Sequence, residues 1–404
     1  MSVNRNRSLM GLMALALSAF AIGTTEFISV GLLPLISEDL NVSVKITGLT
    51  VSLYALGVTI GAPVLTSLTS KMERKTVLLW IMIVFIVGNT IAASATTIGI
   101  LLAARVLSAF SHGVFMSIGS TIAASLVPKD KRASAISIMF TGLTVATVTG
   151  VPFGTFLGQQ FGWRIAFASI VLIGLISLVG NSLLVPSDLA KGKQASFKEQ
   201  LKLITNQRLM LIFVITALGY GGTFVAFTYL SPLLQQVTGF RSDSVAIILL
   251  MYGVTIAVGN MIGGKIANHK PIQALFFMFL IQGVILFTLS MTAPFKYAAL
   301  VTIAFMGLFA FMNVPGLQVY VVMLAERFVP SAVDVASAIN IAAFNAGIAI
   351  GSYLGGTITE SYGLIHTGWL GGVMVSLAVF LTALGIKLDK KDRQLSHSDV
   401  RSAC

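Results

Sequence analysis

Hydrophobic residues along this chain gather in long runs, and short polar segments separate the runs. Most runs reach the roughly 20 residues that an α-helix needs to cross a hydrocarbon layer about 30 Å thick. No polar segment between them is long enough to form a soluble domain. The pattern therefore predicts an all-α integral membrane protein with twelve spanning helices, over residues 9–36, 46–69, 76–95, 98–127, 132–160, 164–185, 208–236, 243–266, 272–292, 297–325, 333–360 and 367–387.

The composition is that of a chain embedded in lipid. Only 10% of the residues are charged and 56% are hydrophobic, whereas soluble domains average about 25% charged residues. The mean hydropathy is +0.93. The single cysteine, Cys404, allows no intramolecular disulfide, so redox chemistry is not expected.

The net charge of +12 would suit a nucleic-acid partner if the basic residues formed one patch, so their distribution decides its meaning. Most of the 26 lysines and arginines fall on the same side of the membrane as the N-terminus, Arg105 falls within a span, and the exceptions are Lys45, Arg164, Arg241 and Lys296. By the positive-inside rule, both termini are cytoplasmic. We therefore expect a multi-pass, monomeric protein of the inner membrane, with anionic lipids at its inner face and no nucleic-acid partner.

The longest polar segment separates six predicted spans from six. It divides the chain into an N-terminal bundle (1–185), a cytoplasmic linker (186–207), a C-terminal bundle (208–387) and a cytoplasmic tail (388–404). Within the linker, Phe197, Leu201 and Ile204 follow a helical spacing that suits an amphipathic helix on the inner membrane face. A solvated tether is equally compatible with this segment.

Short sequence repeats relate the two halves. Gly57-Val-Thr-Ile60 in span 2 returns as Gly253-Val-Thr-Ile256 in span 8, and such parallel repeats are a transporter architecture. Glycines spaced four apart occur in the equivalent spans 2, 5, 8 and 11, where small residues allow close backbone contact. We interpret them as the interface between the bundles, although glycine packing is common in any multi-span protein. They are Gly57, Gly61, Gly150, Gly154, Gly158, Gly259, Gly263, Gly347, Gly351 and Gly355.

Three motifs resemble the major facilitator superfamily, and within it the twelve-span proton-coupled efflux branch of multidrug, sugar and nucleoside exporters. Gly150-Val-Pro-Phe-Gly154, which contains Pro152 and precedes Gly158, is similar to the span 5 antiporter motif of that branch. Arg105-Val-Leu-Ser108, leading to His112, resembles the span 4 arginine motif. Glu26, followed by Gly31-Leu-Leu-Pro34, resembles the first span of arabinose-type sugar exporters and chloramphenicol-type exporters.

The resemblance covers essentially the whole chain, and it implies two pseudo-symmetric six-helix bundles that open alternately to the two sides of the membrane. The loop after span 2 departs from the family pattern, because Ser70 stands where an aspartate is usual and Glu73 where a glycine is usual. Ser70, Glu73, Arg74 and Lys75 are therefore candidates for an inner gate in which Glu73 substitutes for the missing aspartate.

Glu26 is the residue most suggestive of chemistry, because it is a carboxylate inside an otherwise apolar span. It lies about ten residues, or roughly 15 Å, from the outer end of span 1. Water is scarce at that depth, so a carboxyl group there favours its protonated form, and such groups are candidates for proton relays. We expect Glu26 to carry protons and to contribute to substrate binding.

Span 4 runs the opposite way and brings Arg105 and His112 to depths of about 10 and 20 Å, on either side of Glu26. Arg105, Ser108 and His112 share one helical face. Arg105 and His112 are candidates for proton coupling, and Ser108 and His112 for substrate binding. The alternatives are a fixed Glu26–Arg105 ion pair that locks the bundle, and a His112 that is merely hydrogen-bonded.

Further candidates for the substrate cavity lie in the second half, where no acidic residue is deep within a span. Uncharged amides and aromatic rings there suit small amphiphilic or polyhydroxylated solutes. These candidates are Tyr220, Phe224, Phe227 and Tyr229 in span 7, Asn313 in span 10, and Asn340 and Asn345 in span 11.

Signatures of enzymes and cofactors are absent from the sequence. Gly259-Asn-Met-Ile-Gly-Gly-Lys265 imitates a phosphate-binding loop, but Ile266 replaces the required Ser or Thr. We expect no enzymatic activity, no cofactor and no metal site. The sequence predicts a secondary transporter that exports small organic compounds, drug-like or sugar-like, in exchange for protons. A sugar or nucleoside symporter or facilitator is the alternative within this class, and a non-transporting membrane receptor or scaffold is the alternative outside it.

Overall fold

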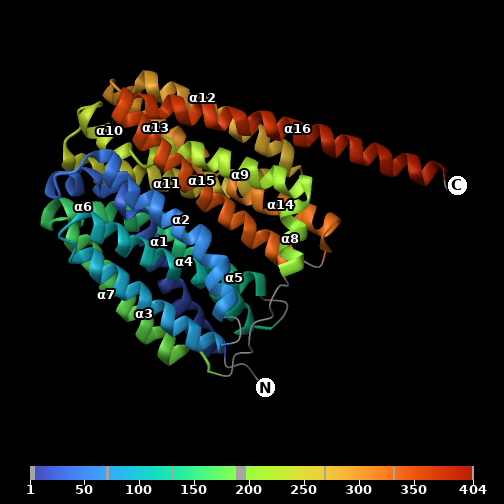
Figure 1. The fold of residues 1–404 in the computed structure, drawn as a ribbon, viewed down its shortest axis with the longest axis horizontal. Coiled ribbons are helices and arrows are strands. Elements are labelled where there is room, and N and C mark those ends of the chain that lie inside the picture. Colours follow the sequence, from blue (N-terminus) through green and yellow to red (C-terminus); the bar gives the residue numbers. More distant parts are fainter. Residues whose placement is uncertain are drawn as a thin grey trace.

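The computed structural model describes residues 5–69, 72–128, 132–187, 197–267, 270–330 and 333–402. Within these ranges every regular element is a helix. Among the described residues there are 12 helices long and apolar enough to cross a membrane, which confirms the predicted all-α fold and number of spans. Figure 1 shows the N-terminal half, coloured blue to green, packed beside the C-terminal half, coloured yellow to red.

The N-terminal half consists of α1 to α7. Its fifth span is built from three consecutive segments, because the π-helical turn η2 joins α5 to α6 and Pro152 lies in the first turn of α6. Gly162, with φ 90°, turns the chain between α6 and α7 in a single residue. The bounds are α1 Arg5–Asp39, α2 Val44–Thr69, α3 Arg74–Ala93, α4 Ile98–Ser125, α5 Arg132–Val145, η2 Ala146–Gly150, α6 Val151–Phe161 and α7 Trp163–Leu184.

The C-terminal half consists of α9 to α16. Its first and fourth spans are interrupted, between α9 and α10 and between α13 and α14. The last helix continues beyond residue 387, so that residues 388–402 of the segment predicted as a tail are part of α16, which projects from the bundle (Figure 1). The bounds are α9 Gln207–Phe227, α10 Leu230–Gln236, α11 Ser242–Ala267, α12 Pro271–Thr292, α13 Lys296–Ala310, α14 Val314–Phe328, α15 Val333–Tyr362 and α16 His366–Ser402.

The predicted linker contains the short helix α8, Phe197–Thr205, and its residues 188–196 lie outside the described ranges. Helix α8 packs against α9 and α15. Leu203 is fully buried, whereas Leu201 and Ile204 are exposed. The described part of the linker is thus a helix docked on the C-terminal half, with an apolar side left uncovered by protein.

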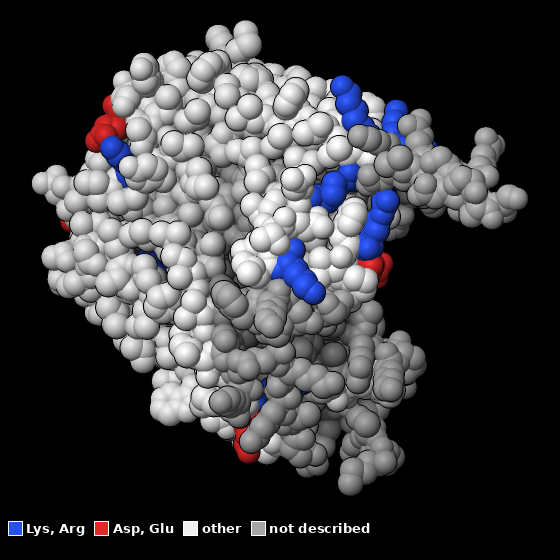
Figure 2. Space-filling view, turned by 45° about the vertical axis from the view of Figure 1, so that its right-hand side comes forward, with Lys and Arg blue, Asp and Glu red and all other residues white. Residues whose placement is uncertain are grey.

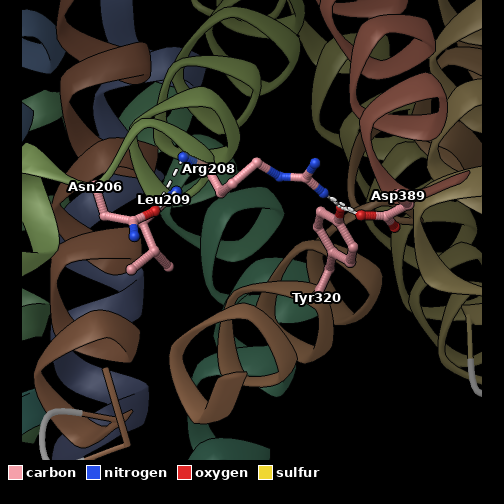
Figure 3. Close-up of polar contacts among 5 residues, drawn as sticks. All are labelled: Asn206, Arg208, Leu209, Tyr320 and Asp389. Carbon is pink, nitrogen blue, oxygen red and sulfur yellow. Dashed lines mark hydrogen bonds and ion pairs between the residues drawn. The ribbon is translucent and has the colours of Figure 1, made fainter. Parts of the chain in front are cut away.

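A polar cluster fixes the start of α9 to the last helix (Figure 3). The Asn206 side chain caps α9 by accepting hydrogen bonds from the backbone N–H groups of Arg208 (3.0 Å) and Leu209 (3.2 Å). The Arg208 guanidinium forms an ion pair with Asp389 on α16. The Tyr320 hydroxyl on α14 donates to the same carboxylate at 3.0 Å. Three helices of the C-terminal half are therefore joined at one carboxylate.

The two halves meet along a seam formed by equivalent spans. Helix α2 packs against α15, and η2 and α6 pack against α11. The hydrophobic core of the C-terminal half continues across this seam and includes Phe27, Val30 and Leu33 of α1. The seam is therefore largely apolar. Spans 2, 5, 8 and 11 supply its main helix contacts, and α1 also contributes to it.

The glycine motifs of these spans do not face the seam, and our interpretation of them needs correction. A helix at the seam also packs within its own half, and a spacing of four does not tell which neighbour the glycines meet. Gly253 does face the seam: a Cβ added there would lie 2.9 Å from the Thr147 carbonyl oxygen of η2. The glycines of the motifs contact elements of their own half. In the N-terminal half, Gly57 and Gly61 contact α4, and Gly150, Gly154 and Gly158 contact α1. In the C-terminal half, Gly259 contacts α13, Gly263 contacts Met312 after α13, Gly347 and Gly351 contact α9, and Gly355 contacts α9 and Tyr229.

Candidate functional site

Glu26 and Arg105 lie together in the interior of the N-terminal half. Among the residues whose side chains the structure describes, they are the only buried Asp, Glu, Lys or Arg residues, with 7% and 1% of their surface exposed. Helix α1 supplies Glu26 and the antiparallel helix α4 supplies Arg105. The depths counted along the two spans had placed these residues at similar levels, and the structure brings them into the same site.

The Arg105 guanidinium binds backbone carbonyl groups and not the carboxylate of Glu26. Its Nη1 donates to the Thr25 carbonyl at 2.6 Å, its Nη2 to the Glu26 carbonyl at 3.1 Å, and its Nε to the Thr50 carbonyl at 3.1 Å. Between Glu26 and Arg105, both of which are described, there is no ion pair within 4.0 Å. The structure thus lacks the fixed ion pair considered as an alternative, because carbonyls of α1 and α2 satisfy the cation.

Tyr54 of α2 and His112 of α4 complete the polar part of this site. The Arg105 guanidinium carbon lies 4.1 Å from the centroid of the Tyr54 ring, which is a cation–π contact. The Tyr54 hydroxyl lies 3.2 Å from Nδ1 of His112. Sequence reasoning missed Tyr54; its phenol inside an apolar span was the available signal. We refer to Glu26, Tyr54, Arg105 and His112 as the buried polar site.

An aromatic cluster joins the two halves directly beside Glu26. Phe27 of α1 lies 6.0 Å from Phe224, 6.4 Å from Phe227 and 6.3 Å from Phe311, measured between ring centroids. Tyr220 packs on Phe224 and Phe311, and it is near enough to Glu26 to interact with its charge. Phe27 and Phe311 were not among the predicted residues, because aromatic side chains are common in membrane spans and only the packing singles them out.

The remaining predicted substrate residues are scattered. Ser108 donates to the Ala104 carbonyl of its own helix and lies against Gly88 of α3, so it does not face Glu26. Tyr229 donates to the Ser352 carbonyl at 2.9 Å and packs on Gly48 of α2, away from the aromatic cluster.

The three asparagines make local contacts within the C-terminal half. Asn340 accepts from Thr216 at 2.8 Å, Asn313 donates to Gln282 at 3.1 Å, and Asn345 donates to the Ile341 carbonyl at 3.0 Å. The side-chain oxygens of Asn313 and Asn345 are buried without a hydrogen-bond partner.

The predicted inner-gate loop is described in part, since Ser70 lies outside the described residues. Glu73 precedes α3, and its side chain does not cap that helix. Lys75 donates to the Ser182 carbonyl of α7 at 2.8 Å, which is a contact within the N-terminal half. Lys75 therefore ties α3 to α7.

Lysine and arginine side chains gather at the end of the molecule from which α16 projects, here named the basic end (Figure 2). At the opposite end, polar contacts join the halves. Lys45 of α2 forms an ion pair with Glu360 of α15 at 2.6 Å. Ser231 of α10 donates to the Gly31 carbonyl of α1 at 3.4 Å. The halves are thus tied together at the end opposite the basic end.

A surface crevice of about 530 Å³ also crosses the seam at the opposite end. Gln159 of α6 spans it by donating to the Ser242 carbonyl of α11. The lining residues come from both halves and are Gln159, Gln160, Gln235, Phe240, Arg241, Ser242 and Asp243.

Comparison with known proteins identifies the family. The profile described as Major Facilitator Superfamily matches residues 15–327. The uncharacterized MFS-type transporter YtbD of Bacillus subtilis (strain 168) is 73% identical to this chain, over 95% of the chain and 97% of its own length. The inner membrane transport protein YdhP of Escherichia coli (strain K12) is 36% identical, over 93% and 96%.

Two solved structures have the same fold. One is a bacterial homologue of the human lysosomal transporter Spinster in an inward-facing, unoccupied conformation, with a TM-score of 0.75, 17% identity, and coverage of 96% of this chain and 99% of that one. The other is the nucleoside transporter NupG, with a TM-score of 0.75, 14% identity, and coverage of 94% and 99%. The chain therefore belongs to the Major Facilitator Superfamily, and it is a multi-pass transporter of the cell inner membrane and not an enzyme.

Proposed function

We propose that this protein exports small organic compounds, drug-like or sugar-like, in exchange for protons, and that Glu26 carries the proton. The observation that carries the proposal is the state of this carboxyl group. It is buried in a membrane-spanning helix and has no hydrogen-bond or ion-pair partner among the described residues. A carboxyl group removed from water and left without a partner can bind and release a proton without breaking a hydrogen bond or an ion pair.

The position of Glu26 suits a coupling role. The next residue, Phe27, contacts aromatic rings of the C-terminal half. A change of charge at Glu26 therefore acts beside the surface along which the two halves separate. Protonation from outside removes a negative charge from this region and favours release of the bound solute, and deprotonation toward the cytoplasm restores the starting state.

The direction of transport is inferred from the resemblance of the span 1, span 4 and span 5 motifs to proton-coupled exporters. A symporter or facilitator for sugars or nucleosides would use the same fold and the same carboxyl group. Collapse of the proton gradient separates the exporter from a facilitator, since it stops proton-driven export and leaves facilitated diffusion unaffected. The direction of proton movement separates the exporter from a symporter, because a symporter moves the proton and the solute in the same direction. Membership of a transporter family counts against a receptor or scaffold.

The test uses purified protein in proteoliposomes with a pH-sensitive dye inside. A thermal-shift screen of sugars, nucleosides and cationic drugs first supplies a transported solute. We expect solute-dependent proton movement in the wild type, its loss in Glu26→Gln, and retention of solute exchange without a gradient in that variant. Glu38→Gln is the matched control, because Glu38 lies near the end of the same helix and is exposed. Undiminished proton-driven transport by Glu26→Gln would refute the assignment.

A further inference from the structure

We propose that Tyr54 is a positioning residue that holds the Arg105 guanidinium on the backbone carbonyls and so keeps it from pairing with the Glu26 carboxylate. Only the expected effect of Tyr54 on proton-driven transport rests on the proposed function, since the position of Arg105 can be tested without measuring transport. Tyr54 lies on α2, one of the seam helices, and its side chain is buried.

The geometry of Arg105 explains why a positioning residue is needed. Three of its nitrogens point to three carbonyl groups on α1 and α2, and these neutral acceptors leave its charge uncompensated. A guanidinium without a counterion is attracted to a nearby carboxylate, and Glu26 is within electrostatic range. The Tyr54 ring covers the guanidinium at 4.1 Å from its centroid, and cation–π attraction of this kind strengthens when water is excluded.

The ring of Tyr54 is itself held in place. Its hydroxyl contacts Nδ1 of His112 at 3.2 Å, and both side chains are buried. Breaking that contact would leave a buried polar atom without a partner, which is unfavourable. The ring also packs against the buried side chains of Val58 and Ala109, so its place over the guanidinium does not depend on the hydroxyl contact alone.

The groups that face Glu26 come from three neighbouring helices. Helix α4 contributes Arg105, helix α2 contributes Tyr54, and helix α9 contributes Tyr220. His112 of α4 contacts Tyr54. The other helices packed on α1 bring no buried Asp, Glu, Lys or Arg from the described ranges. The position of the Arg105 guanidinium therefore dominates the electrostatic environment of the Glu26 carboxyl group.

The consequence can be measured on the carboxyl group itself. Replacing the ring in Tyr54→Leu frees one side of the guanidinium, which then moves into contact with the Glu26 carboxylate. An opposite charge at ion-pair distance favours the ionised carboxyl, so half-protonation should need a proton concentration about tenfold higher or more. Tyr54→Phe keeps the ring over the cation and loses only the hydroxyl, so its titration should stay close to that of the wild type.

The experiment is infrared difference titration of purified protein, in which the carbonyl band missing from Glu26→Gln identifies the Glu26 carboxylic acid. A lower-pH midpoint in Tyr54→Leu, with a near wild-type midpoint in Tyr54→Phe, supports the proposal. An unchanged midpoint in Tyr54→Leu overturns it, and so does an equal shift in both variants, because the hydroxyl and not the ring would then position Arg105. Tyr54→Met serves in place of the leucine variant should that one fail to fold.

Failure of the proposed function gives a different result. Normal proton-driven transport by Glu26→Gln would remove Glu26 from coupling, while the infrared midpoints of the Tyr54 variants would still decide whether Tyr54 positions Arg105. In proteoliposomes, the pH profile of proton-driven transport should shift in the same order as the infrared midpoints.

Discussion

Gly253 offers a direct test of the seam between the halves. An alanine Cβ at this position would lie 2.9 Å from both the Thr147 carbonyl oxygen and the Val148 Cα atom, whereas ordinary contact begins at 3.4 Å. Both atoms belong to the backbone of η2, so neither can rotate away. Helix α11 must therefore separate from η2 by about half an ångström in Gly253→Ala, and overpacking of this kind costs roughly 1–3 kcal/mol.

The cost applies only to the conformation in which α11 touches η2, because these elements belong to different halves. At the lower limit of about 1 kcal/mol, the population of this conformation relative to an alternative with separated halves falls about fivefold. The matched control is Gly264→Ala on the same helix, where the nearest atom, Cβ of Pro315, is 3.8 Å from the added methyl group. Both variants gain the same helix propensity, up to about 1 kcal/mol.

The assay is a spin-label distance measurement across the end opposite the basic end. Exposed positions 41 and 295 lie in different halves, and labelled cysteines there, in a chain with Cys404 replaced by serine, report separation of the halves. We expect the long-distance population to increase severalfold in Gly253→Ala and to remain at the wild-type level in Gly264→Ala. Identical distance distributions in the two variants would show that the Gly253 contact does not limit approach of the halves.

Two further predictions concern ion pairs. Lys45 and Glu360 are 30% and 54% exposed as side chains, so Lys45→Gln should weaken the closed seam only slightly. The same distance measurement should show a modest opening, which the charge-swapped pair Lys45→Glu with Glu360→Lys reverses. No recovery by the swap would contradict an electrostatic role. Asp389→Asn removes the charged partner of Arg208, which is less exposed than Lys45, and the loss of this interaction should lower the free energy of unfolding by about 1.5–3 kcal/mol. The thermal unfolding temperature of Asp389→Asn should therefore fall further than that of Tyr320→Phe. An equal fall in the two variants would count against the ion pair as the main contribution to stability.

The number and order of the spans follow from the sequence because long apolar runs have no other stable arrangement in a bilayer. The interruptions inside spans cannot be predicted in this way, because hydropathy does not depend on whether the backbone hydrogen bonds of a helix are continuous. The apolar run continues through Phe311 and Met312 between α13 and α14. Pro315, near the start of α14, is a local signal of the break. The extension of α16 through residues 388–402 was also missed, since a charged segment can be helical without being apolar.

The sequence predicted the depth of the candidate site residues in the membrane but not the contacts that they make. Counting residues from the span ends brought Glu26 and Arg105 together, since antiparallel helices share a fixed rise per residue. Choosing between an ion pair and carbonyl partners for Arg105 requires the positions of the Thr25 and Thr50 carbonyls, which depend on the rotation of α1 and α2. Helix rotation also decides whether a glycine motif faces the seam, and a single sequence does not reveal it.

The break within the tenth span has a consequence for biogenesis. Helices α13 and α14 have 15 residues each, and a helix of that length covers only about 22 Å of a hydrocarbon layer roughly 30 Å thick. Neither piece can partition into lipid by itself, so the translocation machinery must receive the whole segment Lys296–Phe328 as a single unit. The kink at residues 311–313 then develops only after neighbouring helices have arrived to shelter the polar groups that it uncovers.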